Sequence, residues 1–278
     1  MEKALFGFSF DDGRIDQFTI AYPILKKYGL PATFNITASY IEGRPSEWPF
    51  TEVAPMTLDM LRQLHADPRM EIASHGYWHH NAPDNLLRGV QILCEILQTD
   101  HLYKISNGIA LTGNTVFTTD EDILLAKAKD LKIPVQYIRH SIRRPSFPWL
   151  KIPARKINRL IPSPALFRFA LSDSLMSEYR IYHPSTPHRL YSIPIVANKP
   201  LLDMQALIEK AIQTRTACIF LLHSIVPDGQ RHDPYEMEQS RFDALCSYLA
   251  QCQSASRLQV ATSMDIHQSL LGSTPHHS

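Results

Sequence analysis

Short apolar runs alternate with longer amphipathic segments along most of this chain. The runs have the length of buried strands, and the segments repeat apolar positions at helical spacing. The pattern predicts strands at residues 4–10, 32–37, 70–74, 134–138, 191–196, 217–222 and 258–261. It predicts helices at residues 16–28, 58–65, 86–98, 120–131, 202–214, 234–251 and 263–270. Such alternation is typical of parallel sheets built from βαβ units, and periodicity alone does not separate a barrel from a doubly wound sheet.

The middle of the chain interrupts this pattern. Residues 138–191 are rich in proline, have no clear period and carry many positive charges. From Arg139 to Arg168 there is no acidic residue, and aromatic and aliphatic residues separate the basic ones. This composition suits a phosphate-bearing substrate or the surface of a membrane, to which the protein would bind peripherally. The alternative is a solvated loop whose apolar members pack on the rest of the domain.

Length and composition indicate one α/β domain. The chain has 278 residues, with 44% hydrophobic residues and a net charge of +1. Domains of this class commonly reach about 250 residues, so we expect a single domain over residues 1–272, with a basic, proline-rich insertion at about residues 139–190 and a polar tail at 273–278. The near-zero net charge gives no general attraction to nucleic acid, so no nucleic-acid partner is expected.

The sequence favours a cytoplasmic location. It shows no secretory signal at its start and no apolar run of about 20 residues that could span a bilayer. The four cysteines, Cys94, Cys218, Cys246 and Cys252, form no C-x-x-C pair and stand in apolar or helical stretches. We therefore expect buried, reduced thiols rather than disulfides or a cysteine zinc site.

Candidate chemistry follows two of the predicted strands. Ser9-Phe10-Asp11-Asp12-Gly13 ends the first strand, and His75-Gly76-Tyr77-Trp78-His79 follows the third. The carboxyl ends of parallel strands lie at one edge of a sheet, so these carboxylates and imidazoles are expected to share one crevice. Alone, Asp-Asp-Gly is most often a turn and paired histidines are most often structural. His80 also competes with His79, but the conjunction favours a metal-hydrolase site. We expect His75 and His79 to lie on one face of a helical turn.

These two motifs resemble the first and second motifs of the polysaccharide deacetylase (NodB-homology) family. Phe220-Leu221-Leu222-His223-Ser224 resembles the family's C-terminal Leu-x-His motif. The resemblance implies a distorted (β/α) barrel of about seven parallel strands. It implies a metal site on Asp12, His75 and His79, with Asp11 as general base and His223 as general acid. One divalent ion is expected; zinc is the first choice, and cobalt, nickel or iron stay open.

The chain departs from the family at its third motif. The family has an Arg-x-Pro-Tyr-like turn there, whereas residues 109–115 contain no arginine. Backbone amides of Gly113 and Asn114 remain candidates for an oxyanion site. Arg144 begins a similar tetrapeptide, but only after a further predicted helix and strand. The resemblance places Leu222 in the acyl pocket, and Trp78 is a candidate for stacking on a sugar.

Together these features predict a metal-dependent hydrolase that removes an N-acetyl or similar acyl group. An acetylated amino sugar or glycoconjugate intermediate is the expected substrate. A deformylase or an O-acetyl esterase would use nearly the same groups, and a non-catalytic carbohydrate-binding barrel is the alternative from another class. Asp11→Asn separates that binder from an enzyme, because binding needs no general base.

Overall fold

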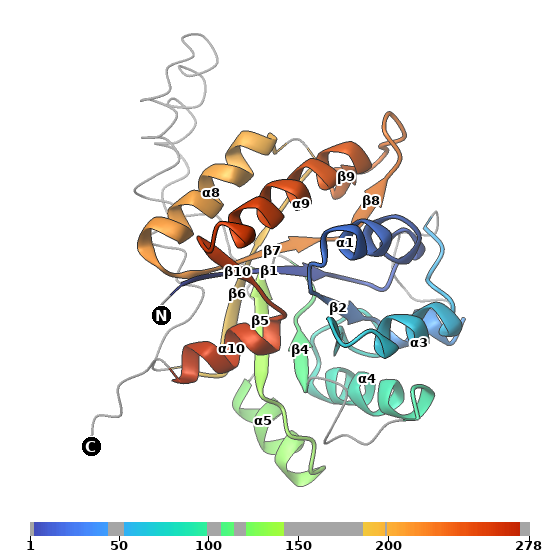
Figure 1. Cartoon of the computed structure of the whole chain (residues 1–278). Helices are drawn as coiled ribbons and strands as arrows, with labels where there is room; N and C mark the ends of the chain where they lie inside the picture. Colours follow the sequence, from blue (N-terminus) through green and yellow to red (C-terminus); the bar gives the residue numbers. More distant parts are fainter. Residues whose placement is uncertain are drawn as a thin grey trace, which may run out of the picture.

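Parallel strands close into a barrel in the computed structural model, which describes residues 3–43, 53–98, 107–113, 121–141, 186–197 and 199–272. The strands pair in the order β1 to β7, and β7 pairs with β1 to close the seven-stranded barrel (Figure 1). These strands are β1 (Ala4–Phe10), β2 (Ala32–Ile36), β3 (Met70–Ser74), β4 (Gly108–Ala110), β5 (Tyr137–Ser141), β6 (Arg189–Pro194) and β7 (Ala217–Leu222). The predicted α/β barrel is therefore confirmed.

Strand β1 has three parallel partners. One edge pairs with β7 from Leu5 to Phe10. The other edge pairs with β10 (Leu258–Val260) near its start and with β2 at Ser9 and Phe10. All seven residues of β1 are buried, which explains why its sequence is almost continuously apolar rather than alternating.

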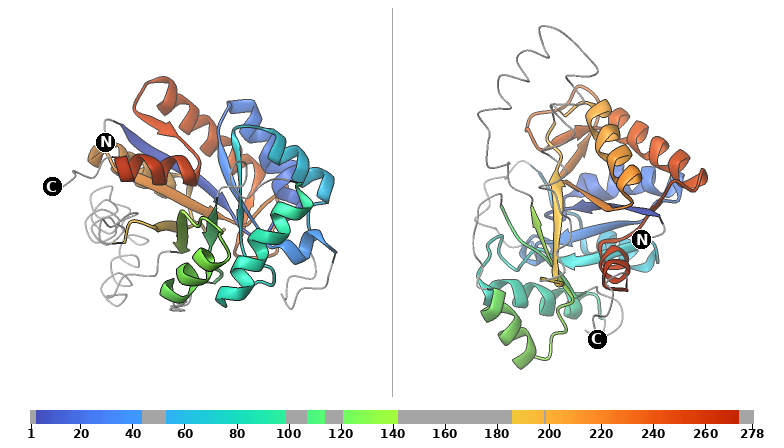
Figure 2. Two further views of the ribbon diagram at one scale, coloured as in Figure 1. Left: turned by 90° about the horizontal axis from the view of Figure 1, so that it is seen from below. Right: turned by 90° about the vertical axis from the view of Figure 1, so that its left-hand side faces the viewer.

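Helices surround the barrel, and Figure 2 shows this arrangement from two further directions. They are α1 (Tyr22–Tyr28), α2 (Ala38–Ile41), α3 (Leu58–Ala66), α4 (Pro83–Ile96), α5 (Glu121–Asp130), α8 (Leu201–Thr214), α9 (Gln239–Ser254) and α10 (Ser263–Gly272). A π-helical turn, η1 (Gln17–Ala21), leads directly into α1. Phe8 and Phe10 of β1 pack their rings against Phe242 of α9, so the main core lies between strands and helices.

The start of α10 packs against the barrel strands. Its Ile266 joins a separate buried cluster that includes Leu5, Tyr137 and Ile219. A Cβ atom at Gly7 would lie only 2.8 Å from the end of the Ile266 side chain, so a larger residue there would force that side chain to move. Glu71 of β3 accepts a hydrogen bond from the backbone N–H of Met264, which satisfies a donor in the first turn of α10.

Most predicted elements are confirmed, with errors in several regions. The strand predicted at 134–138 begins only at Tyr137, and α2 and β8 (Ser224–Val226) were not predicted. Strand β4 is absent from the prediction because its three residues are too few for a period. The helix predicted at 234–251 begins only at Gln239, because residues 236–238 form β9 (Glu236–Glu238), which pairs with β8. The side chain of Glu236 accepts from the backbone N–H groups of His232 and Asp233, and this turn directs the chain into β9.

Most of the predicted insertion, residues 142–185, and the polar tail lie outside the described residues. The described ends of the insertion belong to strands β5 and β6, so the barrel extends further into this region than the sequence pattern indicates. All four cysteines are buried, as expected. Within the described ranges, no helix combines the length and apolar character needed to cross a membrane.

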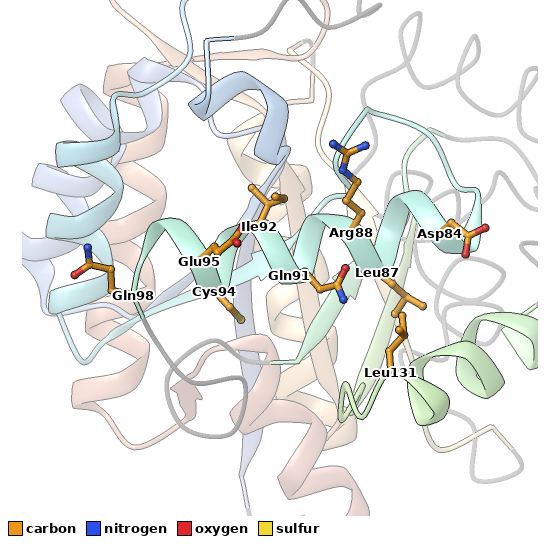
Figure 3. A pocket seen from close by; sticks show the side chains of 9 residues that line it. All are labelled: Asp84, Leu87, Arg88, Gln91, Ile92, Cys94, Glu95, Gln98 and Leu131. Atoms are coloured by element: carbon orange, nitrogen blue, oxygen red, sulfur yellow. The ribbon is translucent and has the colours of Figure 1, made fainter.

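An open groove of 750 Å³ follows the outer face of α4 (Figure 3). Arg88 and Gln91 project from α4 there, and Leu131 contributes from the turn after α5. None of the residues that line this groove belongs to the motifs at the strand ends.

Candidate active site

A sharp turn after β1 presents two carboxylates. The backbone φ angles of Asp12 and Gly13 are +83° and +85°, a left-handed region that aspartate tolerates better than most residues and glycine adopts freely. The turn is held by the Asp11 N–H, which donates to Leu222 O of β7, and by the Thr37 N–H, which donates to Asp12 O. Both carboxylates are therefore held in fixed, buried positions at the strand end.

The second motif forms a loop and not the helical turn that we predicted for His75 and His79. Strand β3 ends at Ser74, and Gly76, with a φ angle of +86°, turns the chain directly after His75. Asn85 of α4 organises the loop, because its side chain accepts from Trp78 N and donates to the carbonyl oxygen of His80. The two histidines converge because this loop folds back, and helical periodicity has no part in it.

Three side chains converge as a metal-ligand set. Asp12 Oδ1 lies 3.6 Å from His75 Nε2 and 3.4 Å from His79 Nε2, and the two imidazole nitrogens are 3.1 Å apart. The ligand atoms all lie within 4.8 Å of one another. Asp12 Oδ1 is buried and has no hydrogen-bond partner within the part of the chain that the structure describes. Two imidazoles and one carboxylate fit a divalent transition metal and leave a coordination position for water or substrate.

His75 has a defined orientation in this set. Its Nδ1 lies 2.9 Å from the carbonyl oxygen of Ala110 in β4, so the Nδ1–H donates there and Nε2 keeps its lone pair for an ion. Burial and the neighbouring His79 lower the pKa of His75 to about 3, so its imidazole stays neutral. His80 is exposed, and the geometry therefore selects His79 over His80.

The second oxygen of Asp12 is occupied by an arginine. Arg14 Nε and Nη2 both lie 2.8 Å from Asp12 Oδ2. Burial alone would raise the pKa of Asp12, but the close contact with His79 and the charges of His223 and Arg14 hold it well below its usual range. Asp12 is thus ionised at neutral pH.

Asp11 has different partners. Arg139 Nη2 donates to its Oδ1 through a buried ion pair, and Asn35 Nδ2 donates to the same oxygen at 2.8 Å. The other oxygen, Oδ2, lies 3.7 Å from His75 Nε2 and so borders the ligand set. Burial raises the pKa of Asp11, while the charges of Arg139 and His223 oppose that rise.

Arg139 corrects the sequence interpretation in two ways. We assigned it to the basic insertion, but it lies in β5 and is fully buried, so it contributes nothing to a basic surface. An arginine on the strand after residues 109–115 thus contacts Asp11. The signal was its place directly after the apolar Tyr137 and Ile138, one residue past the predicted strand.

His223 follows β7 and faces the same strand ends. Its ring packs against Tyr235 with centroids 5.1 Å apart, and its buried Nδ1 has no hydrogen-bond partner within the described ranges. Burial lowers its pKa, and the charges of Asp12 and Asp11 oppose that effect. Gln17 connects the two strand ends, because its Nε2 donates to the carbonyl oxygens of both Asp11 and His223.

The predicted substrate-binding residues are not brought together in this way. Leu222 is buried in the main core cluster. Trp78 is partly buried and packs edge-on against Tyr77. Gly113 is exposed with a φ angle of +75°, and Asn114 lies outside the described residues.

Comparison with known proteins supports the resemblance drawn from the motifs. Residues 1–108 match the family model described as polysaccharide deacetylase. This region includes Asp11, Asp12, His75 and His79 but not His223. No curated protein matches the chain.

Solved structures with a similar fold include several deacetylases. A family 4 carbohydrate esterase from Streptomyces lividans aligns at 11% identity over 96% of this chain and 95% of its own, with a TM-score of 0.47. The Xyl-CE4 domain of a multidomain xylanase from the hindgut metagenome of Trinervitermes trinervoides aligns at 14% identity over 98% and 93%, with a TM-score of 0.46. A de-N-acetylase from Aggregatibacter actinomycetemcomitans aligns at 17% identity over 50% and 63%, with a TM-score of 0.38. The chain thus spans less than two thirds of that last protein.

Proposed function

We propose, from the premise that residues 1–108 match the polysaccharide deacetylase family, that this protein is a metal-dependent hydrolase that removes an N-acetyl group from an amino sugar or a carbohydrate-containing intermediate. One observation carries the proposal. Asp12, His75 and His79 place three ligand atoms within 4.8 Å of one another, and a second carboxylate, Asp11, borders them. A binding protein has no need of a ligand set next to a candidate base.

Asp12 Oδ1, His75 Nε2 and His79 Nε2 would hold the divalent ion, with zinc as first choice. When bound, the ion supplies a Lewis acid that polarises the acyl carbonyl and activates water. This donor set of two nitrogens and one oxygen also accepts cobalt, nickel or iron.

Asp11 is proposed as the general base. Its Oδ1 is held by Arg139 and Asn35, so only Oδ2 is directed toward the ligand set and is available to accept a proton. Arg139 is proposed to keep Asp11 ionised despite its burial, because the positive charge opposes the rise in pKa.

His223 is proposed as the general acid that donates a proton to the leaving amine. His223 and Asp11 follow neighbouring strands. Gln17 connects their backbones by donating to both carbonyl oxygens. Base and acid thus come from different strands, β1 and β7, that are paired side by side.

Acetylated amino sugars and glycoconjugates are the proposed substrate class. Hydrolysis of an N-formyl group or of an O-acetyl ester would use the same base, acid and ion. We still predict that the basic segment ending at Arg168 contacts phosphate or a membrane surface. The cytoplasmic location is likewise a prediction. Arg139 is removed from that segment.

The test combines metal content with product release. Purified protein is analysed for transition metals after dialysis, loaded with zinc or cobalt, and assayed against N-acetylated, N-formylated and O-acetylated sugars for release of acetate or formate. We expect about one ion per chain and release from an N-acetylated substrate that depends on the ion and on Asp11. Ion binding without hydrolysis of any substrate, with Asp11→Asn indistinguishable from wild type, would support the carbohydrate-binding alternative instead.

A further inference from the structure

Arg14 bridges two parts of the site that are 210 positions apart in the chain. Its Nε donates to Asp12 Oδ2, and its Nη2 lies 2.8 Å from the same oxygen in an ion pair. Its Nη1 donates to Ser224 Oγ at 3.1 Å. Ser224 directly follows His223. The arginine is 4% exposed, and its backbone forms an isolated bridge with Pro55, so both its ends are fixed.

The consequence for Asp12 is an asymmetric carboxylate. Oδ2 accepts a charge-assisted hydrogen bond from Nε and lies 2.8 Å from Nη2 in an ion pair, whereas Oδ1 has no hydrogen-bond partner among the described residues and points at both imidazoles. A carboxylate can bind an ion through one oxygen or through both. Here one oxygen is already engaged.

We propose that Arg14 is a positioning residue that makes Asp12 a one-oxygen ligand, an inference that rests on the proposed metal site. The arginine holds Oδ2 away from the ion. Its hydrogen bond to Ser224 connects the Asp12 carboxylate to the residue directly after His223. Lysine cannot reproduce this arrangement, because an ammonium lacks the planar guanidinium that places Nε and Nη2 both at 2.8 Å from one oxygen.

The positive charge of Arg14 should also affect the affinity for the ion, and the direction of that effect can be measured. Arg14 neutralises Asp12 and also repels a divalent ion close by. Without it, both Asp12 oxygens face the ligand set and the repulsion is gone, so the ion should bind more tightly but with a different coordination. Loss of a purely structural contact would instead weaken ion binding.

The experiment uses the full chain loaded with cobalt(II), whose visible absorption is strong in four-coordinate sites and weaker when another ligand atom joins. Affinity is measured by competition with a chromophoric chelator. For Arg14→Met we expect affinity to rise by roughly tenfold or more, with a weaker visible band. For Arg14→Lys we expect affinity near wild type, because the charge is kept, and an altered band, because the two-point grip is lost.

Ser224→Ala serves as the matched control. It removes the far contact of Arg14 and leaves both contacts with Asp12, so it should keep the wild-type band. An unchanged band in Arg14→Met and Arg14→Lys, or weaker binding in both with the wild-type band, would overturn the proposal. If Arg14→Met does not fold, the band of Arg14→Lys decides. Failure of the wild-type protein to bind cobalt would instead refute the metal site on which the proposal rests.

Discussion

Asp11 and Asp12 are consecutive carboxylates, both buried and each paired with an arginine, yet their environments differ. Asp12 gives one oxygen to Arg14 and turns the other toward two histidines. Asp11 gives one oxygen to Arg139 and Asn35 and leaves the other at the border of the ligand set. At Asp11 burial is the larger effect and raises the pKa. At Asp12 hydrogen bonding and nearby positive charge together outweigh burial and lower the pKa.

This difference shows how one turn can supply two chemical roles. A ligand must be ionised at all working pH values, whereas a base must also be able to accept a proton. The left-handed backbone at Asp12 separates the two side chains, so that each meets a different arginine from a different part of the chain. Removing one partner at a time tests whether the two carboxylates have these separate roles.

The largest effect is expected on the Asp12 side from His79→Ala. Loss of one of three ligands should lower metal affinity by more than about 100-fold, since even outer contacts of ligands are worth about 10- to 100-fold. Metal content after identical dialysis of variant and wild type measures this. His80→Ala is the matched control, because that neighbouring histidine is exposed. Metal loss in both variants would contradict the assignment.

A large effect confined to turnover is expected on the Asp11 side. Asp11→Asn should lower the rate of acetate release by about 10²- to 10⁴-fold, the usual contribution of a general base. Bound metal should stay near wild type, whereas Asp12→Asn should lose metal and activity together. If the two variants behaved alike, the division of roles between these neighbours would be refuted.

A stability effect is expected from Arg139→Met. This change leaves Asp11 buried with no opposite charge, which costs about 3–5 kcal/mol in the free energy of unfolding measured with urea. The double variant with Asp11→Asn should recover part of that loss. In the single variant the pKa of Asp11 should rise further, so the acid limb of the activity profile should move to higher pH. Equal stability of the single and double variants would show that the pair is not coupled.

The smallest effect is expected outside the site, at Glu121. Strand β5 directs Arg139 to Asp11, while the next residue, His140, pairs with Glu121 of α5 at 3.1 Å. Burial would raise the pKa of Glu121, but hydrogen bonds from His140, Arg189 and His188 lower it from 4.5 to about 2. Its stabilisation is therefore present above pH 4.5 and is lost as the pH falls toward 2.

Glu121→Gln should flatten the fall in melting temperature between pH 5 and pH 3. Metal content and acetate release should stay at the wild-type level. A loss of metal would mean that the outer pair communicates with the site and would weaken the contrast between the two faces of β5.

Much of the barrel was predictable because its buried strands are short apolar runs with clear helices between them. Residues 4–10, 70–74 and 217–222 were predicted with the bounds that the structure gives. Strand β4 was missed because three residues carry no period. The error at residues 234–238 arose because Glu236 forms a side-chain turn that resembles the polar start of a helix.

The candidate ligands were predictable from two motifs at strand ends, whereas their partners were not. Asn35 and Arg139 contact Asp11 from other strands, 24 and 128 positions away, and the only local signal was the place of Arg139 directly after two apolar residues. Arg14 stands only two positions from Asp12, but its other contact is with Ser224, which follows the neighbouring strand β7. Helical spacing led us to pair His75 with His79, and the two do converge. The cause is not a helix but a loop, which is shaped by Gly76 and Asn85.

Strand β1 pairs with three other strands, and this connects the order of folding to ion binding. The strand that carries both carboxylates is made early in synthesis, but β7 and β10, which pair with it, are made late. Contacts this distant in sequence form slowly. Arg14 cannot reach Ser224, nor can Gln17 reach His223, until the barrel has closed. The three ion ligands all lie between Asp12 and His79. Uptake of a divalent ion during refolding would therefore report assembly of β1 to β3, before the contacts to Ser224 and His223 mark closure of the barrel, and the ion would stabilise the folded state by mass action.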